Sequence, residues 1–289
     1  MEDNMPDADY EMEAFILAEA LSLTYRGWFR HPPVTALDKI QLAASPGEIV
    51  GILGPNGSGK TSLLNILAGS QRPNAGEVKV LGHHPTDRAL IGDVGYQAEG
   101  PLPFPDFSAM EFLSYLGELV GMRRSLARVR ADLWAERLGL DPSKRQPIGT
   151  YSTGMTRRLA LAAALLSEPK VLLLDEPTSG LDPKGSLIVM DLLQELQKEG
   201  NCAILMASHH LQEVEQICTR IYLLDKGQCH AQGTLEDLLG TGDRSLVIRG
   251  LDDAGLATVE SAVTAAGGEI VKIGREREHL FALFRKPRP

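Results

Sequence analysis

The segment of residues 54–61, which reads Gly-Pro-Asn-Gly-Ser-Gly-Lys-Thr, limits the possible fold more strongly than any other feature of this 289-residue chain. A short apolar run precedes it at residues 48–53, and leucines with helical spacing follow it at residues 61–68. A strand, a glycine-rich loop and a helix in that order form a loop that binds phosphate through backbone N–H groups and a helix N-terminus. The segment therefore predicts a P-loop within an α/β fold, and an ordinary glycine turn explains the full pattern poorly.

The P-loop predicts a nucleotide site with a bound magnesium ion. Lys60 is expected to reach the β- and γ-phosphates, and the Thr61 hydroxyl is expected to ligate Mg²⁺. An acidic partner follows the apolar run of residues 171–174, where Asp175 would hold Mg²⁺ and Glu176 would activate the attacking water. The whole phosphate-binding set is Gly54, Pro55, Asn56, Gly57, Ser58, Gly59, Lys60 and Thr61.

Strand-like and helix-like segments alternate along the chain, which predicts a mostly parallel sheet with right-handed crossovers. A helical insert of about residues 101–166 interrupts the alternation, and Ser108 and Glu111 have the spacing of a capping box at its first helix. We expect a loose acidic N-terminus at residues 1–13, a main domain at 14–240 and a small α+β appendage at 241–289.

Composition narrows the possible functions. The formal net charge is −9, so a general nucleic-acid binder is not expected. No apolar run has the length of a membrane-spanning helix, and the acidic N-terminus lacks the pattern of a signal peptide. The three cysteines are odd in number and widely spaced, which disfavours a disulfide framework or a zinc site. A cytoplasmic protein is expected, and any work at a membrane would need a partner that spans it.

The segment Tyr151-Ser152-Thr153-Gly154-Met155 narrows the class of P-loop protein. With the later Ser-Gly-Leu-Asp of residues 179–182, it resembles the signature and D-loop of ABC transporter ATP-binding subunits, over about residues 15–235. Ser152 and Gly154 match the usual LSGGQ signature, whereas Tyr151, Thr153 and Met155 depart from it. The resemblance implies a P-loop NTPase of the ABC type, in which Ser152 and Gly154 bind the ATP held by a second copy.

The resemblance also implies roles for three residues outside these motifs. Gln97 would contact Mg²⁺ and the attacking water, and His209 would contact the γ-phosphate, with the adjacent His210 as the competing assignment. Tyr25, at the end of the first strand, would stack on adenine, a contact worth about 1–3 kcal/mol per base in nucleic-acid systems. The rival aromatic residues in the following loop are Trp28 and Phe29.

The resemblance is greatest to the ATPases of bacterial exporters that have a separately encoded permease. It implies a Mg²⁺-dependent ATPase that pairs head to tail with a second copy and docks on a transmembrane permease at the cytoplasmic face of the membrane. Two alternatives stay open. One is a soluble ABC-type ATPase that acts on a protein or nucleic acid, and the other is a regulatory subunit that binds ATP without hydrolysis.

Overall fold

The computed structural model describes residues 14–26 and 32–239. The strands are β1 (Ile16–Tyr25), β2 (Val34–Ala44), β3 (Ile49–Leu53), β4 (Ala75–Val80), β5 (Val94–Gln97), β6 (Val171–Asp175), β7 (Ala203–Ser208), β8 (Arg220–Asp225) and β9 (Gln228–Gly233). The α-helices are α2 (Lys60–Leu67), α3 (Ala109–Leu119), α4 (Arg124–Arg137), α5 (Thr153–Leu165), α6 (Pro183–Glu199), α7 (Leu211–Ile217) and α8 (Leu235–Leu239). Two short 3₁₀ helices are η1 (Arg88–Leu90) and η2 (Ile148–Thr150).

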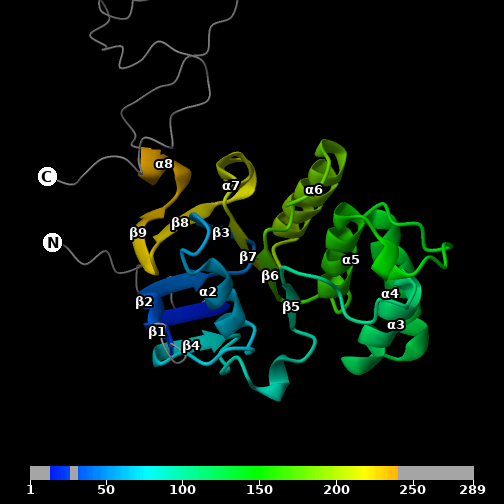
Figure 1. Cartoon of the computed structure of the whole chain (residues 1–289), viewed down its shortest axis with the longest axis horizontal. Helices are drawn as coiled ribbons and strands as arrows, with labels where there is room; N and C mark the ends of the chain where they lie inside the picture. Colours follow the sequence, from blue (N-terminus) through cyan, green and yellow to red (C-terminus); the bar gives the residue numbers. More distant parts are fainter. Residues whose placement is uncertain (1–13, 27–31, 240–289) are drawn as a thin grey trace, which may run out of the picture. The chain divides into compact units, whose positions relative to one another are not determined.

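The central element is a six-stranded sheet with the order β5-β6-β7-β3-β8-β9 (Figure 1). Its first five strands run parallel, and β9 is antiparallel to β8. The strand before the P-loop, β3, lies between β7 and β8, so Gly51 pairs with Met206 on one side and Ile221 on the other. The predicted α/β fold with a mostly parallel sheet is confirmed.

A second, antiparallel sheet has the order β2-β1-β4. The alternating pattern of residues 15–25 and the segment at 77–82 predict strands near β1 and β4, but the sequence predicts no strand at Val34–Ala44, which forms β2. Its burial does not alternate regularly, and its pairing with β1 shifts register three times. An irregular strand of this kind gives only a weak period-two pattern in the sequence.

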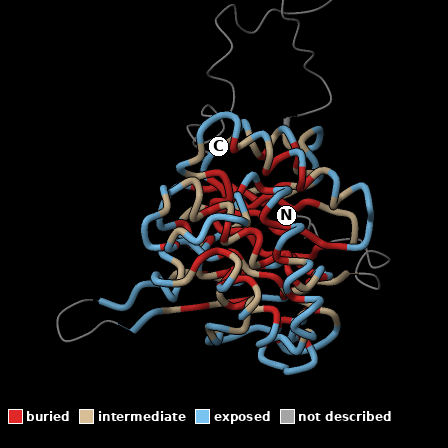
Figure 2. Tube along the Cα trace, turned by 90° about the vertical axis from the view of Figure 1, so that its right-hand side faces the viewer, coloured by how far each residue is buried: buried red, intermediate tan, exposed pale blue. Residues whose placement is uncertain are grey.

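Two apolar cores lie on opposite faces of the six-stranded sheet, and alternate residues of one strand enter different cores. In β6, Leu172 and Leu174 join the core that includes α3 to α7, whereas Val171 and Leu173 join the core that includes α2, β1 and β2. Figure 2 shows these buried stretches surrounded by exposed ones. Burial on both faces explains why β6 reads as a continuous apolar run.

Helices α3, α4 and α5 pack on one another beyond the β5 edge of the sheet (Figure 1). The predicted capping box is confirmed, since the Ser108 side chain accepts from the Glu111 N–H and the Glu111 side chain accepts from the Ser108 N–H. The apolar spacing of residues 187–198 predicts an amphipathic helix, and α6 begins four residues earlier, at Pro183, because the Asp182 side chain caps it. A glycine after such a stretch predicts the helix stop, and Gly200 does end α6, in the left-handed conformation.

The chain divides into two compact units, residues 1–238 and 239–289. The acidic N-terminus at 1–13, the appendage at 241–289 and the rival aromatic residues Trp28 and Phe29 lie outside the described residues. The domain boundaries drawn from the sequence stay predictions. Among the described residues, no helix combines the length and apolar character needed to cross a membrane.

Candidate functional site

The loop between β3 and α2 has a backbone that requires glycine. Gly57 and Gly59 have φ angles of +81° and +110°, which side-chain-bearing residues rarely adopt. A Cβ atom on Gly54 would lie 2.2 Å from the carbonyl oxygen of Leu224 on β8. Helix α2 begins at Lys60 with no side chain capping its first N–H groups. Uncapped N–H groups at a helix N-terminus form an anion site, so residues 54–61 have the geometry of a phosphate-binding loop.

Lys60 is buried at the base of this loop. Its ammonium group donates to the carbonyl oxygens of Gly54 at 2.8 Å and Pro55 at 3.2 Å, and it lies 3.9 Å from Oε1 of Glu176. Burial lowers the pKa of Lys60, while the neighbouring carboxylates Glu176 and Asp175 oppose that shift. Lys60 thus lies at the base of the loop, with acidic neighbours at the end of β6.

Asp175, the last residue of β6, is buried beside the P-loop helix. Burial raises the pKa of its carboxyl group, and the Thr61 side chain partly offsets this shift. Neither carboxylate oxygen forms a hydrogen bond of standard geometry within the described residues. A buried carboxylate with free oxygens beside a threonine hydroxyl is a suitable ligand set for Mg²⁺, which prefers oxygen.

Glu176 connects the lysine to the histidine that follows β7. Its Oε2 atom lies 2.8 Å from Nδ1 of His209, and its side chain is 8% exposed. The Glu176 backbone has a φ of +52°, a strained conformation for a residue other than glycine. His210 is also close, since one ligand atom from each of Glu176, His209 and His210 lies within 4.8 Å of the others. The predicted set of Lys60, Glu176 and His209 is therefore brought together.

A partly buried hydrogen-bond network that joins the segment after Glu176 to helix α7 was not predicted from the sequence. Thr178, just after β6, donates to Oε2 of Glu213 on α7, and the hydroxyl of Ser208 donates to the same oxygen at 3.5 Å. The Ser208 hydroxyl also accepts from the His210 N–H at 3.0 Å. Glu213 thus connects the segment that carries Glu176 to the segment that carries both histidines.

Gln97 occupies a different environment from the other candidates. It is 1% exposed, and neither atom of its amide group has a hydrogen-bond partner within the described residues. Its neighbour Tyr96 donates to Asn65 on α2, and strand residues alternate between faces, so Gln97 lies on the opposite face, against α5. The Gln97 amide forms no hydrogen bond with Lys60 or Asp175 in the described part of the chain, and its role stays a prediction.

The loop after Gln97 contributes a carboxylate that the sequence reasoning missed. Arg157 of α5 is largely buried, and it donates to the carbonyl of Ala98 and to Oε1 of Glu99, both at 3.4 Å. The negative charge of Glu99 raises the pKa of Asp175, and only burial and the Thr61 hydrogen bond affect that pKa more strongly. Arg157 therefore ties the signature helix to the loop that faces the site.

Tyr25 ends β1 and is 43% exposed. Its hydroxyl lies 3.1 Å from the hydroxyl of Ser62 on α2, so the ring stands beside the P-loop helix. An exposed aromatic ring next to a phosphate site can stack on a nucleobase. The structure brings Tyr25 to the site, and its stacking role stays a prediction.

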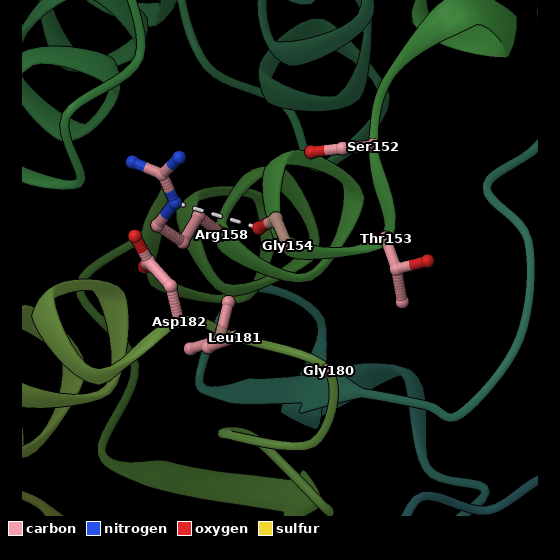
Figure 3. Close-up of a pocket in the computed structure, with 7 residues that line it drawn as sticks. All are labelled: Ser152, Thr153, Gly154, Arg158, Gly180, Leu181 and Asp182. Atoms are coloured by element: carbon pink, nitrogen blue, oxygen red, sulfur yellow. Dashed lines mark hydrogen bonds between the residues drawn. The ribbon is translucent and has the colours of Figure 1, made fainter.

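The signature and D-loop segments line one pocket of about 400 Å³ (Figure 3). Ser152 caps α5 by accepting from the Met155 N–H at 3.2 Å. Thr153 points away from Ser152 in Figure 3. Arg158 contacts the carbonyl of Gly154 and also donates to the carbonyls of Leu138 and Gly139 at the end of α4, at 2.7 and 3.0 Å. The lining residues are Ser152, Thr153, Gly154, Arg158, Gly180, Leu181 and Asp182.

A second pocket, of about 520 Å³, lies between the loop after β5 and the start of α5. Thr153 belongs to both pockets, so one side chain stands between them. The residues that line the second pocket are Glu99, Gly100, Pro101, Leu102, Pro105, Ile148, Gly149, Tyr151, Thr153, Thr156 and Arg157.

Comparison with known proteins gives consistent results. Residues 37–179 match the family model described as ABC transporter. An uncharacterized ABC transporter ATP-binding protein, YxlF of Bacillus subtilis, is 38% identical over 203 residues, which cover 70% of this chain and 67% of the relative. The daunorubicin resistance ATP-binding protein DrrA3 of Streptomyces coeruleorubidus is 39% identical over 236 residues, which cover 79% and 73% respectively.

Solved structures show the same fold. The dimeric bacterial ABC transporter cassette MJ0796 aligns with a TM-score of 0.69 at 26% identity, over 76% of this chain and 98% of that one. A post-hydrolysis state of the same cassette, bound to ADP and Pi, aligns with a TM-score of 0.70 at 24% identity, over 76% and 98%. With relatives this similar over this length, the chain belongs to the ABC transporter ATP-binding proteins and is an ATP-binding ATPase of that family.

Proposed function

We propose that this chain hydrolyses ATP to power export through a separately encoded transmembrane permease, at the cytoplasmic face of the membrane. The observation that carries the proposal is the position of Glu176, between Lys60 at 3.9 Å and His209 at 2.8 Å. A carboxylate held at the end of a P-loop site by a lysine and a histidine is suited to activate a water for attack on a phosphate.

Different residues of the site bind the phosphates, the base and the metal ion of the nucleotide. The P-loop N–H groups and Lys60 hold the phosphates, and Tyr25 stacks on the base. Mg²⁺ would be held by Thr61 and Asp175, and when bound it neutralises charge on the β- and γ-phosphates. Glu176 accepts a proton from the attacking water, and His209 orients Glu176 and donates toward the γ-phosphate.

The pocket at Ser152 and Gly154 supports pairing with a second copy. The pocket presents the start of α5 to an anion, whereas the P-loop of the same chain lies at the start of α2. One chain therefore carries two separate surfaces for phosphate. A head-to-tail dimer would give each ATP both surfaces, and the similar MJ0796 cassette is described as dimeric. Binding of ATP would then favour the closed dimer and hydrolysis would favour its reopening.

The second pocket is the proposed docking surface for the permease. It adjoins the loop after Gln97 and the signature helix, so a partner seated there would sense movement of α5 through Arg157. Export is favoured because two similar proteins are named for daunorubicin and doxorubicin resistance.

Copurification from membranes in a mild detergent tests this proposal. We expect a multi-spanning protein to elute with the wild-type chain and to be lost with Pro101→Arg, which places a bulky charge in the second pocket. Leu187→Arg, at an exposed position on α6, is the matched control and should retain the partner. Both variants should keep basal ATP hydrolysis.

The alternatives make different predictions. A soluble ATPase would remain fully active with no membrane protein attached, and that result would support the soluble function in place of transport. A binding-only subunit would bind ATP with no hydrolysis above that of Glu176→Gln. The net charge of −9 argues against a nucleic-acid partner.

A further inference from the structure

His210 has no part in the function proposed above, yet its side chain stands at the reactive end of the site. Strand β7 ends at Ser208 and delivers two histidines in succession, and their ring centroids are 3.9 Å apart. Glu176, from the end of the adjacent strand β6, faces them, and the ligand atoms of the three residues lie within 4.8 Å of one another.

Two imidazoles and a carboxylate form a ligand set with a defined metal preference. Zn²⁺ and neighbouring divalent transition metals bind imidazole nitrogen and carboxylate oxygen at about 2.0–2.2 Å, often with water as a fourth ligand. Mg²⁺ prefers oxygen ligands throughout and gains little from the histidines. The cluster therefore suits a metal of the zinc class and differs in chemistry from the oxygen ligands at Thr61 and Asp175.

The geometry is close to that of a three-residue metal site. Ligand atoms of a tetrahedral zinc site lie about 3.4 Å apart, as bonds of about 2.0–2.2 Å require. His209 Nδ1 and Glu176 Oε2 are 2.8 Å apart, and one ligand atom from each of the three residues lies within 4.8 Å of the other two. Both histidines are exposed and can rotate, while Glu176 is held largely buried. Small side-chain rotations would bring the three ligands to bonding distance and leave a solvent-facing position for water.

We propose that Glu176, His209 and His210 bind a divalent transition-metal ion of the zinc class when the site holds no nucleotide. The bound ion occupies the carboxylate oxygen and the histidine nitrogen that hydrolysis requires, so it holds the subunit inactive. This inhibitory consequence rests on the proposed function, whereas the binding itself does not.

The described cysteines are poor competitors for the same ion. Burial raises the pKa of Cys202 and Cys218 to about 12 and that of Cys229 to about 11, so their thiols stay protonated near neutral pH. Metals of this class bind the thiolate form. Cobalt can report the ligand type, because thiolate ligation adds a sulfur-to-metal charge-transfer band and imidazole ligation does not.

Calorimetric titration of the nucleotide-free full-length protein with Zn²⁺ tests the proposal. We expect one site per chain, weakened about tenfold or more in His210→Ala and again in Glu176→Gln. His84→Ala removes an exposed histidine whose ring contacts Thr86 and should leave the affinity unchanged. At a buffered concentration of free Zn²⁺, ATP hydrolysis by the wild type should be inhibited. His210→Ala should need a correspondingly higher Zn²⁺ concentration for the same inhibition.

Three results would overturn the proposal. The first is a Zn²⁺ affinity that neither His210→Ala nor Glu176→Gln changes. The second is a cobalt spectrum with a thiolate charge-transfer band. The third is a loss of Zn²⁺ affinity in His84→Ala as large as that in His210→Ala. Thermal unfolding of each variant shows whether it is folded, and His210 is exposed, so its replacement should not unfold the chain. If the metal binds as expected but does not affect hydrolysis, the site stands and the inhibitory consequence fails.

Discussion

The methyl group of Thr153 lies against the backbone of Gly180, so close that a Cβ atom on Gly180 would stand 2.8 Å from it. Thr153 occupies the signature position where the family usually has glycine, and Gly180 belongs to the D-loop. The unusual signature residue therefore packs against the D-loop of its own chain, in addition to facing two pockets.

Gly180→Ala should destabilise the protein through this contact. The φ of +76° at Gly180 costs an alanine about 1–2 kcal/mol, and the clash with Thr153 adds to that cost. Gly82→Ala is the matched control, because Gly82 has a φ of +77° with open space around it. In denaturant unfolding, the double variant Thr153→Gly/Gly180→Ala should regain only the part of the free energy of unfolding that the clash removes. If Gly180→Ala and Gly82→Ala lose the same free energy of unfolding, Thr153 does not press on the D-loop.

Glu176→Gln should abolish most ATP hydrolysis while leaving ATP binding intact. Removing a general base typically lowers a rate by about 10²–10⁴-fold. Phosphate release and equilibrium ATP binding measure the two effects separately. Glu195→Gln, which removes a surface ion pair with Arg137, should change neither. Hydrolysis that persists at the wild-type rate in Glu176→Gln would remove Glu176 from the mechanism.

Asp175→Asn should stabilise the nucleotide-free protein at neutral pH. Burial raises the pKa of Asp175 above its unfolded value, so the charged form weakens the folded state at any pH above that raised pKa. The asparagine variant is free of this penalty, and its Tm should exceed that of the wild type by about 2–4 °C per kcal/mol relieved.

The Tm advantage of Asp175→Asn should shrink as the pH falls through the raised pKa, because the wild-type carboxyl then becomes neutral in the folded state. The advantage should also reverse when Mg²⁺ and ATP are added, because the variant loses a metal ligand. A Tm difference that is constant from acid to neutral pH would contradict a raised pKa at Asp175.

Glu213→Ala should lower the rate of hydrolysis more than the affinity for ATP. It leaves the buried hydroxyls of Thr178 and Ser208 without their shared acceptor, at a cost of about 1–3 kcal/mol in stability. Glu213→Gln keeps an acceptor oxygen and should restore most of the rate. Steady-state kinetics and ATP titration give the comparison, and Glu215→Ala on the same helix serves as control. A purely structural role would leave kcat unchanged in the folded fraction.

The sequence predicted the parts of the site that local patterns encode. Glycines at 57 and 59, the lysine that opens α2 and the acidic pair at the end of β6 each belong to a short segment with a known backbone. The capping box at Ser108 is local in the same sense. Such features depend on neighbours a few residues away, so one sequence contains all the information that they need.

The remaining features depend on residues that meet only in the folded chain. Thr178 and Glu213 are 35 residues apart, and Arg157 and Glu99 are 58 residues apart, so no spacing rule connects them. The burial of Gln97 against α5 depends on the phase of strand alternation in β5, which four residues are too few to reveal. The irregular strand β2 escaped prediction for a similar reason.

The place of β3 between β7 and β8 has a consequence for how the protein is made. The strand that leads into the P-loop leaves the ribosome early, but both strands that flank it in the sheet come from residues 203–225. Until that stretch has been synthesised, β3 has neither of its sheet partners, and both cores lack the buried residues that β7 and β8 contribute beside it. A ribosome stalled before residue 203 therefore carries a nascent chain that contains the complete P-loop sequence but not a folded nucleotide site.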